Sequence, residues 1–256
     1  MLPFPPSDMA FYLTAVPAVI LLGLDKGGFA GLSSLAMPLL ALVVSPVKAA
    51  AMVLPILIVQ DWVGVWAYRR DFDRRNLAIL TPAAAIGVAA GWLMAARVDD
   101  QAVRLVLGFI SVGFVVFMLL RSRLARGAAA RAAVAPGLFW GAIAGFTSFV
   151  SHAGAPPVMA YMLPQKLEPR VFAATCAIFF AIVNLMKLGP YFALGQFSRD
   201  NLSASASLLP MAVLSTIAGV WLIRRVSAQR FYFAILALTF LVGVKLIWDG
   251  ASGLWT

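Results

Sequence analysis

Two polar stretches interrupt otherwise apolar segments of the chain, and their side chains are suited to binding an anion. The first, LDKGGFAGLSS at residues 24–34, combines Lys26 with glycines and hydroxyls. The second, SFVSHAGAPP at residues 148–157, contains His152, the single histidine of the sequence. Glycines let a ligand approach the backbone closely, and a helix that begins after such a break presents unpaired N–H groups and the positive end of its dipole. Lysine, hydroxyls and helix N-termini together are typical of a site for a small anion.

The predicted site also includes a third segment, AIFFAIVNLMKLGPYF. Asn184 and Lys187 are three residues apart in this segment and therefore lie on one face of a helix. We expect the anion contacts to come from Lys26, Gly27, Gly28, Ser33, Ser34, Thr147, Ser148, Ser151, His152, Gly154, Asn184 and Lys187. If a proton accompanies the anion, Asp25, Asp61 or His152 would carry it.

Each of these groups also has an ordinary structural explanation. Asp25 and Lys26 would neutralise each other while the glycines allow close helix packing, as small residues do in membranes. His152 would be a hydrogen-bonded packing residue. Lys187 would extend its ammonium group to the membrane surface, because the sequence at 189–190, Gly-Pro, indicates a nearby helix end. Charges at membrane depth are costly and rarely idle, which favours a binding role for the first stretch.

Helices that cross a membrane must position these stretches. Of 256 residues, 62% are hydrophobic and only 12% are charged, about half the charged fraction of a soluble domain. Apolar runs near or above the roughly 18 to 20 residues needed to cross a bilayer recur along the chain, which indicates helices rather than a barrel. The apolar segments are 10–44, 49–68, 77–96, 103–120, 137–163, 171–193, 202–223 and 231–248. The sequence therefore predicts an all-α integral membrane protein without a soluble domain.

Composition also excludes several classes of function. The formal charge of +10 comes from Lys and Arg in short loops, which indicates membrane orientation and not a nucleic-acid partner. Cys176 is the single cysteine, so an internal disulfide is excluded, and neither a metal nor a cofactor is expected. One histidine, one cysteine and no recognisable set of nucleophile, base and orienting group argue against an enzyme.

An internal repeat divides the chain into two halves. DFDRRNL at 71–77 recurs as QFSRDNL at 196–202, and GWLMAARVDDQ at 91–101 recurs as GVWLIRRVSAQ at 219–229. The matches lie in loops and keep their order, which is typical of duplicated transporters. The domains that we expect are a first repeat over 1–120, a basic cytoplasmic linker over 121–136 and a second repeat over 137–256.

The two interrupted segments, 10–44 and 137–163, admit two models. Segment 10–44 is too long for one straight span, whereas arms of about 15 residues would reach only about 22 Å. It is therefore either one broken crossing or a re-entrant hairpin. If both segments are hairpins, 13 loop cations lie on one side and 4 on the other, whereas single crossings divide them 9 against 8. The positive-inside rule favours hairpins, with the basic loops cytoplasmic.

Hairpins determine the expected architecture. Each repeat then holds one re-entrant helical hairpin and three transmembrane helices, so the second repeat is inverted relative to the first. The two hairpin tips would meet near the membrane midplane. Two positions remain open for the second break: residues 145–148, with Thr147 or Ser148 capping the returning arm, or residues 152–155, with Pro156 in its first turn.

The stretches DKGGFAGLSSLAMP and SHAGAPP, together with the Asn-x-x-Lys segment, resemble the TauE/SafE family of sulfite exporters, also called TSUP permeases, from about residue 10 to 248. The matching positions are Gly27, Gly28, Pro38, His152, Gly154, Pro156, Pro157, Asn184 and Lys187. Family members often have a fuller glycine run at the second stretch, where this chain has Ala155. The resemblance implies a permease for small sulfur-containing anions such as sulfite, thiosulfate or organosulfonates, often in the bacterial inner membrane.

We therefore expect a multi-pass secondary transporter that exports a small sulfur-containing anion. Its expected partners are that anion and membrane lipid. The sequence does not decide between a monomer and a homodimer. A permease for another small anion, such as a carboxylate, and a membrane partner protein that transports nothing are the alternatives.

Overall fold

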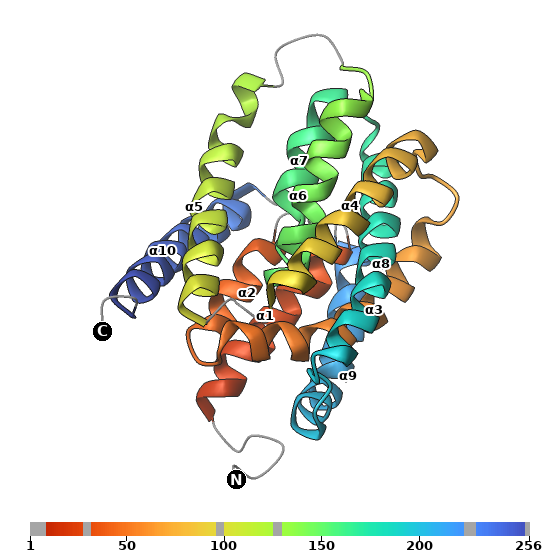
Figure 1. Ribbon diagram of the computed structural model, residues 1–256. Helices are drawn as coiled ribbons and strands as arrows, with labels where there is room; N and C mark the ends of the chain where they lie inside the picture. The colour runs from red at the N-terminus through yellow and green to blue at the C-terminus, as the bar shows by residue number, and fades with distance from the viewer. Residues whose placement is uncertain (1–8, 28–31, 96–99, 125–129, 223–228, 254–256) are drawn as a thin grey trace.

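The computed structural model describes residues 9–27, 32–95, 100–124, 130–222 and 229–253, and this part of the chain contains helices and no strand. Eight of its helices are long and apolar enough to cross a membrane (Figure 1). These are α1 (Met9–Lys26), α3 (Pro46–Tyr68), α4 (Arg74–Ala95), α5 (Asp100–Leu124), α6 (Val134–Ser151), α8 (Pro169–Ala193), α9 (Arg199–Leu222) and α10 (Gln229–Gly253). The protein is a multi-pass membrane protein, and the all-α prediction is confirmed.

Both interrupted segments consist of a long helix followed by a short one. Helix α1 has 18 residues and is followed by α2 (Ser33–Ala41) with 9, and α6 has 18 residues and is followed by α7 (Ala155–Met162) with 8. The expectation of two equal arms is therefore wrong. At about 1.5 Å per residue the long helices reach about 27 Å and the short ones about 12 to 14 Å.

Proline chemistry explains why the second arms are short. Pro46 opens α3 after Ser45, whose side chain caps that helix, so α2 must end a few residues earlier. Pro164 lies in the 3-10 turn η1 (Leu163–Gln165), which ends at Lys166 in the left-handed conformation, with φ of 51°. A proline removes one helical N–H donor and crowds the preceding turn, so α7 cannot extend far.

The second break lies at the later of the two predicted positions. Residues 145–148 are helical, and α6 continues to Ser151. His152 ends the helix in the left-handed conformation with φ of 53°, and α7 begins at Ala155 with proline in its first turn. In the first half, α1 ends at Lys26 and α2 begins at Ser33. Both long helices thus end inside a polar stretch.

The order and lengths of the helices repeat in the two halves. Helices α1 and α6 have 18 residues each, α5 and α10 have 25 each, α3 and α8 have 23 and 25, and α4 and α9 have 22 and 24. The recurring loops also cap equivalent helices. Asp73 accepts from the backbone N–H of Asn76 at 2.7 Å before α4, and Ser198 accepts from that of Asn201 at 3.2 Å before α9. Helix α5 reaches Leu124 and α6 begins at Val134, so both helices extend into the expected linker.

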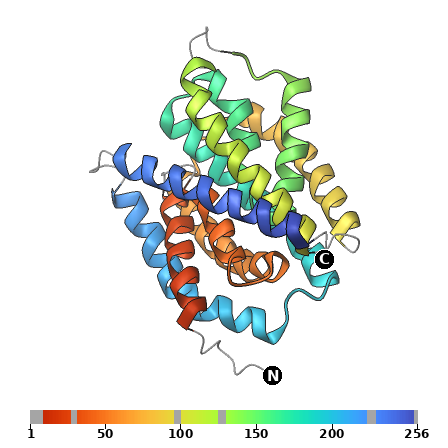
Figure 2. The same cartoon turned by 90° about the vertical axis from the view of Figure 1, so that its left-hand side faces the viewer.

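Glycines bring helices of different halves into backbone contact. A Cβ atom on Gly27, directly after α1, would lie 2.5 Å from the backbone of Gly219 on α9. A Cβ on Gly145 of α6 would lie 2.1 Å from the carbonyl oxygen of Ala84 on α4. Small residues permit such close approach between membrane helices. Helices α5 and α10 pack against each other at one side of the bundle (Figures 1 and 2), and α3 contacts both α8 and α9.

Three connections meet at one end of the molecule, which we call the basic end and define as residues 69–73, residues 130–133 and η1. Arg170 forms an ion pair with Asp71 at 2.9 Å. Arg75 Nε donates to the carbonyl of Ala132 at 3.0 Å, and the amide of Ala130 donates to the carbonyl of Pro164 at 3.0 Å. The basic end therefore joins the connections that flank α4, α6 and α8.

The connections 42–45 and 194–198 and the start of α5 lie at the opposite end (Figure 1). Arg104 of α5 donates to the carbonyl of Ala41, the last residue of α2, at 2.7 Å. A mostly apolar cavity of about 310 Å³ is lined there by residues that include Val47, Ala95, Ala102 and Gln196. The two ends thus contain different sets of connections.

A reciprocal amide pair fastens the basic end. Asn76 Nδ2 donates to Gln165 Oε1 at 2.9 Å and Gln165 Nε2 donates to Asn76 Oδ1 at 3.1 Å, and both side chains are buried. We expect Asn76→Ala to lower the free energy of unfolding by about 1 to 3 kcal/mol, because it leaves the buried Oε1 atom of Gln165 without its donor. Thermal unfolding in detergent measures this loss. The control is Asn201→Ala at the equivalent, partly buried position, and equal losses for the two variants would contradict the prediction.

Candidate functional site

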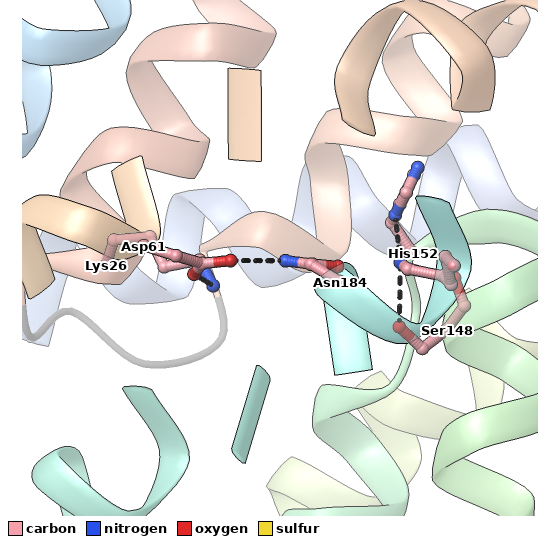
Figure 3. A network of polar contacts seen from close by, with 6 residues as sticks. Lys26, Asp61, Ser148, His152 and Asn184 are labelled. Carbon is pink, nitrogen blue, oxygen red and sulfur yellow. Dashed lines mark hydrogen bonds and ion pairs between the residues drawn. The ribbon is translucent and has the colours of Figure 1, made fainter. Parts of the chain in front are cut away.

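The first polar cluster joins α1, α3 and α8 inside the bundle. Lys26 forms an ion pair with Asp61 Oδ1, and Asn184 Nδ2 donates to Asp61 Oδ2 at 2.6 Å (Figure 3). The side chains of Lys26 and Asp61 are only 10% and 5% exposed. The Lys26 ammonium also lies 5.4 Å from the ring centroid of Phe180. Both oxygens of the Asp61 carboxylate are therefore engaged by donors.

The second polar cluster joins α8 to the break after α6. Lys187 Nζ donates to the carbonyl of Ser148 at 3.1 Å and to its hydroxyl at 3.1 Å, and it lies 2.7 Å from His152 Nδ1. His152 Nε2 donates to the carbonyl of Ala50 on α3 at 2.8 Å. Lys187 is fully buried, so the alternative in which it extends to the membrane surface is wrong. Figure 3 shows Ser148 and His152 next to the Lys26–Asp61–Asn184 cluster.

Both clusters border one small cavity, which we call the central cavity. Its volume is about 30 Å³, enough for two or three waters at about 10 to 15 Å³ each. The lining residues are Leu22, Asp25, Lys26, Ser33, Leu57, Ser148, His152, Ala155, Phe180 and Asn184. A second cavity of about 10 Å³ shares Ser33, His152 and Ala155 and adds Ser34, Ser111 and Phe114 among its lining residues. The starts of α2 and α7 therefore lie between the two cavities.

The two short helices present different N-termini to this region. At the start of α2, the amide of Ser33 donates to the carboxylate of Asp25 at 3.3 Å, so an acidic side chain already faces that helix dipole. At the start of α7, Gly154 is the N-cap and makes no side-chain capping bond. Pro156 and Pro157 have no N–H, so the donors at this end are the amides of Gly154 and Ala155. The start of α7 is thus the better candidate for an external anion.

The structure brings together only part of the predicted set. Lys26, Ser33, Ser148, His152 and Asn184 line the central cavity, Ser34 lines the second cavity and Lys187 lies behind Ser148 and His152. The hydroxyls of Thr147 and Ser151 bond to carbonyls of their own helix, at 2.9 Å to Ile143 and 3.2 Å to Thr147, and neither residue lines the two cavities. Their predicted contact with the anion has no support in this geometry.

Packing, not ligand access, explains two of the predicted glycines. The amide of Gly27 donates to the carbonyl of Gly23 at 2.9 Å, and Gly219 leaves no room for a Cβ at position 27. A Cβ on Gly154 would lie 2.9 Å from the ring of Phe180, although the amide of Gly154 stays at the start of α7. Gly28 lies outside the described residues. The amide of Gly27 is therefore already bonded, and its predicted contact with the anion has no support in this geometry.

Three residues of the site were missed in the sequence. Ala50 contributes only a carbonyl oxygen, which no residue type reveals. Phe180 lies against Lys26, and the hydroxyl of Tyr191 donates to the carbonyl of Phe149 at 2.7 Å, next to the second break. Tyr191 is four residues after Lys187, so the helical face that carries Asn184 and Lys187 would have indicated it.

Comparison with known families decides the class of protein. The sequence model of the family described as "Sulfite exporter TauE/SafE" matches residues 15–246, nearly the whole chain. The chain belongs to the TauE/SafE family. TauE/SafE proteins are transporters and not enzymes, which agrees with the resemblance of the two polar stretches. No curated protein and no solved structure matches the chain.

The donors of this TauE/SafE protein suit an anion better than a metal cation. Within the described residues, no group of three or more His, Cys, Asp or Glu side chains could hold a metal ion. Lys26 and two serine hydroxyls line the central cavity at the start of α7 instead, and Lys187 lies behind Ser148. This arrangement agrees with a family that moves a small anion across the membrane.

Proposed function

We propose that this protein exports a small sulfur-containing anion, such as sulfite, thiosulfate or an organosulfonate, which binds in the central cavity. The observation that carries the proposal is the convergence of the starts of α2 and α7 on one cavity inside the bundle, with Lys26 in its wall and the buried Lys187 behind Ser148 and His152. Transporters with broken helices often direct helix N-termini at an anionic substrate near the midplane. The family of the chain supports the substrate class.

The proposed contacts centre on the second hairpin. The amides of Gly154 and Ala155 and the hydroxyls of Ser33 and Ser148 donate to the oxygens of the anion, and the dipole of α7 adds positive potential. Lys26 approaches from the opposite wall of the cavity. Asp61 neutralises Lys26 when no anion is bound. The Lys26 ammonium becomes available to the anion when it exchanges the Asp61 carboxylate for the anion.

We infer that the two halves are inverted repeats, each with one re-entrant hairpin and three spans. Three observations support this: the repeated helix lengths, the equivalent caps of α4 and α9, and the grouping of connections at the two ends. If α2 and α7 did not return, the connection at 163–168 would lie opposite residues 69–73. The Asp71–Arg170 ion pair instead joins these connections. Cation-rich loops then make the basic end cytoplasmic in a bacterial inner membrane.

Two carboxylates of the site, Asp25 and Asp61, are candidates for carrying a coupled proton. The Asp61 carboxylate accepts from Lys26 and Asn184, and the Asp25 carboxylate accepts from the Ser33 amide, so both are bonded as ionised groups. Protonation of either one would release a donor for the anion, which keeps Asp25 and Asp61 as candidates. Uncoupled export is also feasible, since an inside-negative potential contributes about 2.3 kcal/mol per charge and 100 mV to anion efflux.

Flux in proteoliposomes tests the proposed function. We expect sulfite, thiosulfate, taurine or sulfoacetate to cross membranes that contain the protein faster than empty liposomes. Lactate serves as a carboxylate without sulfur. If lactate crosses and none of the sulfur anions does, the substrate is a carboxylate and the proposed sulfur-containing substrate is wrong. If no anion crosses faster than in empty liposomes, the transporter proposal is overturned.

A cavity-filling variant tests the location of the anion. Ala155 lines both cavities, so Ala155→Leu is expected to lower sulfur-anion flux at least about tenfold by occupying the space of the ligand, which costs about 1.4 kcal/mol or more of binding. Ala218→Leu on the exposed face of α9 is the control and should leave flux unchanged. Equal flux in the two variants would place the anion elsewhere.

A further inference from the structure

The Lys187 ammonium is bonded only to uncharged acceptors. Its three partners are the carbonyl and hydroxyl of Ser148 and the Nδ1 atom of His152, at 3.1, 3.1 and 2.7 Å. Lys187 is fully buried. A lysine ammonium has three N–H donors, so these partners satisfy its hydrogen bonds without neutralising its charge. A buried charge without a counterion is costly, which makes the protonation state of Lys187 responsive to a nearby anion.

The hydrogen bonds of His152 are determined by its partners. The carbonyl of Ala50 can only accept, so the Nε2 atom of His152 carries the hydrogen. The neutral ring then has its lone pair on Nδ1, which accepts from Lys187. A second proton on His152 would sit on Nδ1 and break the contact with Lys187. While Lys187 is charged, His152 therefore acts as an acceptor in this cluster and takes up no second proton.

The hydroxyl of Ser148 allows two protonation states of Lys187 to be fully hydrogen-bonded. In the charged state, Lys187 donates to the Ser148 carbonyl, the Ser148 hydroxyl and His152. In the neutral state, the amine donates to the carbonyl and to His152, and its lone pair accepts from the Ser148 hydroxyl, which can both donate and accept. Loss of one proton from Lys187 and rotation of one hydroxyl change the first state into the second. The cluster thus accommodates either state without moving a helix.

The charged groups around Lys187 are few. Asp61 of α3 and Lys26 of α1 form an ion pair with each other, and Asp25 of α1 bonds to the start of α2. On α8 itself, Tyr191 donates to a backbone carbonyl of α6. The charged residues of α4, Arg74 and Arg75, are exposed at its start. An anion in the central cavity, which Ser148 and His152 line, would therefore be the nearest group free to compensate a charge on Lys187.

We propose that Lys187 binds a proton together with the transported anion, so that one proton accompanies each anion. This inference rests on the proposed anion site. When the anion leaves, the proton of Lys187 leaves with it and the Ser148 hydroxyl turns to donate to the neutral amine. The Lys187–Ser148–His152 cluster is then a proton site behind the anion site. In this scheme neither Asp25 nor Asp61 is needed to carry the proton.

Calorimetry of the purified protein tests this inference. Thiosulfate is the probe because it does not itself titrate near neutral pH. Titrations in two buffers with different ionisation enthalpies give the number of protons taken up per bound anion. We expect one proton to be taken up per bound thiosulfate. In the pH range where Lys187 of the free protein is neutral, the affinity should then fall about tenfold for each unit by which the pH rises.

Two substitutions of Lys187 assign the proton. Lys187→Arg is permanently charged and should bind thiosulfate without proton uptake and with little dependence on pH. Lys187→Gln is permanently neutral and should bind at least about tenfold more weakly, also without proton uptake. Lys245→Gln, at a 59% exposed lysine of α10, is the control and should keep wild-type proton uptake.

The outcomes separate this inference from the proposed function. Thiosulfate binding to the wild-type protein without proton uptake would overturn the proton site and leave the anion site intact. Proton uptake that persists in either Lys187 variant would assign the proton to another group and also overturn the inference. If one variant fails to fold, the wild-type measurement and the other variant still decide. If neither thiosulfate nor sulfite binds, the proposed function fails first.

Discussion

Lys26→Met is expected to abolish anion flux and also to lower the free energy of unfolding by about 3 to 5 kcal/mol. The loss of flux follows from the position of Lys26 on the wall of the central cavity. The loss of stability follows from Asp61, whose side chain is only 5% exposed and would become a buried carboxylate without its counterion. From the sequence, loss of Lys26 would be expected to spare the fold. The ion pair changes that expectation.

The double variant Lys26→Met/Asp61→Asn separates the two effects. Removing the charge of Asp61 should restore most of the lost stability, because an amide is much less costly to bury than an unpaired carboxylate. Flux should stay absent. Unfolding in detergent and flux in proteoliposomes measure the two quantities. The control is Lys245→Met in the exposed pair with Asp249, which should cost at most about 1 kcal/mol. Wild-type stability of Lys26→Met alone would contradict the account of this ion pair.

Gly145→Ala is expected to destabilise the protein by about 1 to 3 kcal/mol or more, although alanine is the better helix former. The new methyl group would lie 2.1 Å from the carbonyl oxygen of Ala84, so α6 and α4 must move apart. The equivalent change on the other helix, Gly87→Ala, would place its methyl 2.0 Å from the carbonyl of Ala142 and should behave alike. Loss of folded protein in detergent, followed by size-exclusion chromatography and thermal unfolding, measures the effect.

The control is a glycine on α5 with open space around it. No heavy atom lies within 4 Å of a Cβ built on Gly113, so Gly113→Ala should be neutral or stabilise by up to about 1 kcal/mol. If Gly145→Ala matched Gly113→Ala, the close contact between α4 and α6 would not contribute to stability.

The sequence predicted the helices well because a membrane imposes a strict length and polarity on each span. The recurring loops were readable for a related reason, since Asp73 and Ser198 use ordinary capping chemistry at equivalent positions. The unequal lengths of α1 and α2, and of α6 and α7, were not predicted. Their lengths depend on where Pro46 and Pro164 terminate the returning helices, and apolar composition alone does not reveal such ends.

The candidate site was predicted in its residue types and only partly in its contacts. Lys26 was expected beside Asp25 or an anion, yet its ion-pair partner is Asp61, which is 35 positions away. That pairing depends on how α1 and α3 are rotated about their axes. Ala50 contributes a backbone carbonyl, and Gly27 fits against Gly219, so both depend on contacts that only the packed bundle defines.

The glycine contacts between the halves also constrain how the chain is made. Ribosomal synthesis delivers α1 and α4 to the membrane well before α9 and α6, the helices against which their glycines fit. Until then Gly23, Gly27 and Gly87 lack the backbone contacts that these helices provide. The first half therefore stays incompletely packed until the second half has been inserted into the bilayer.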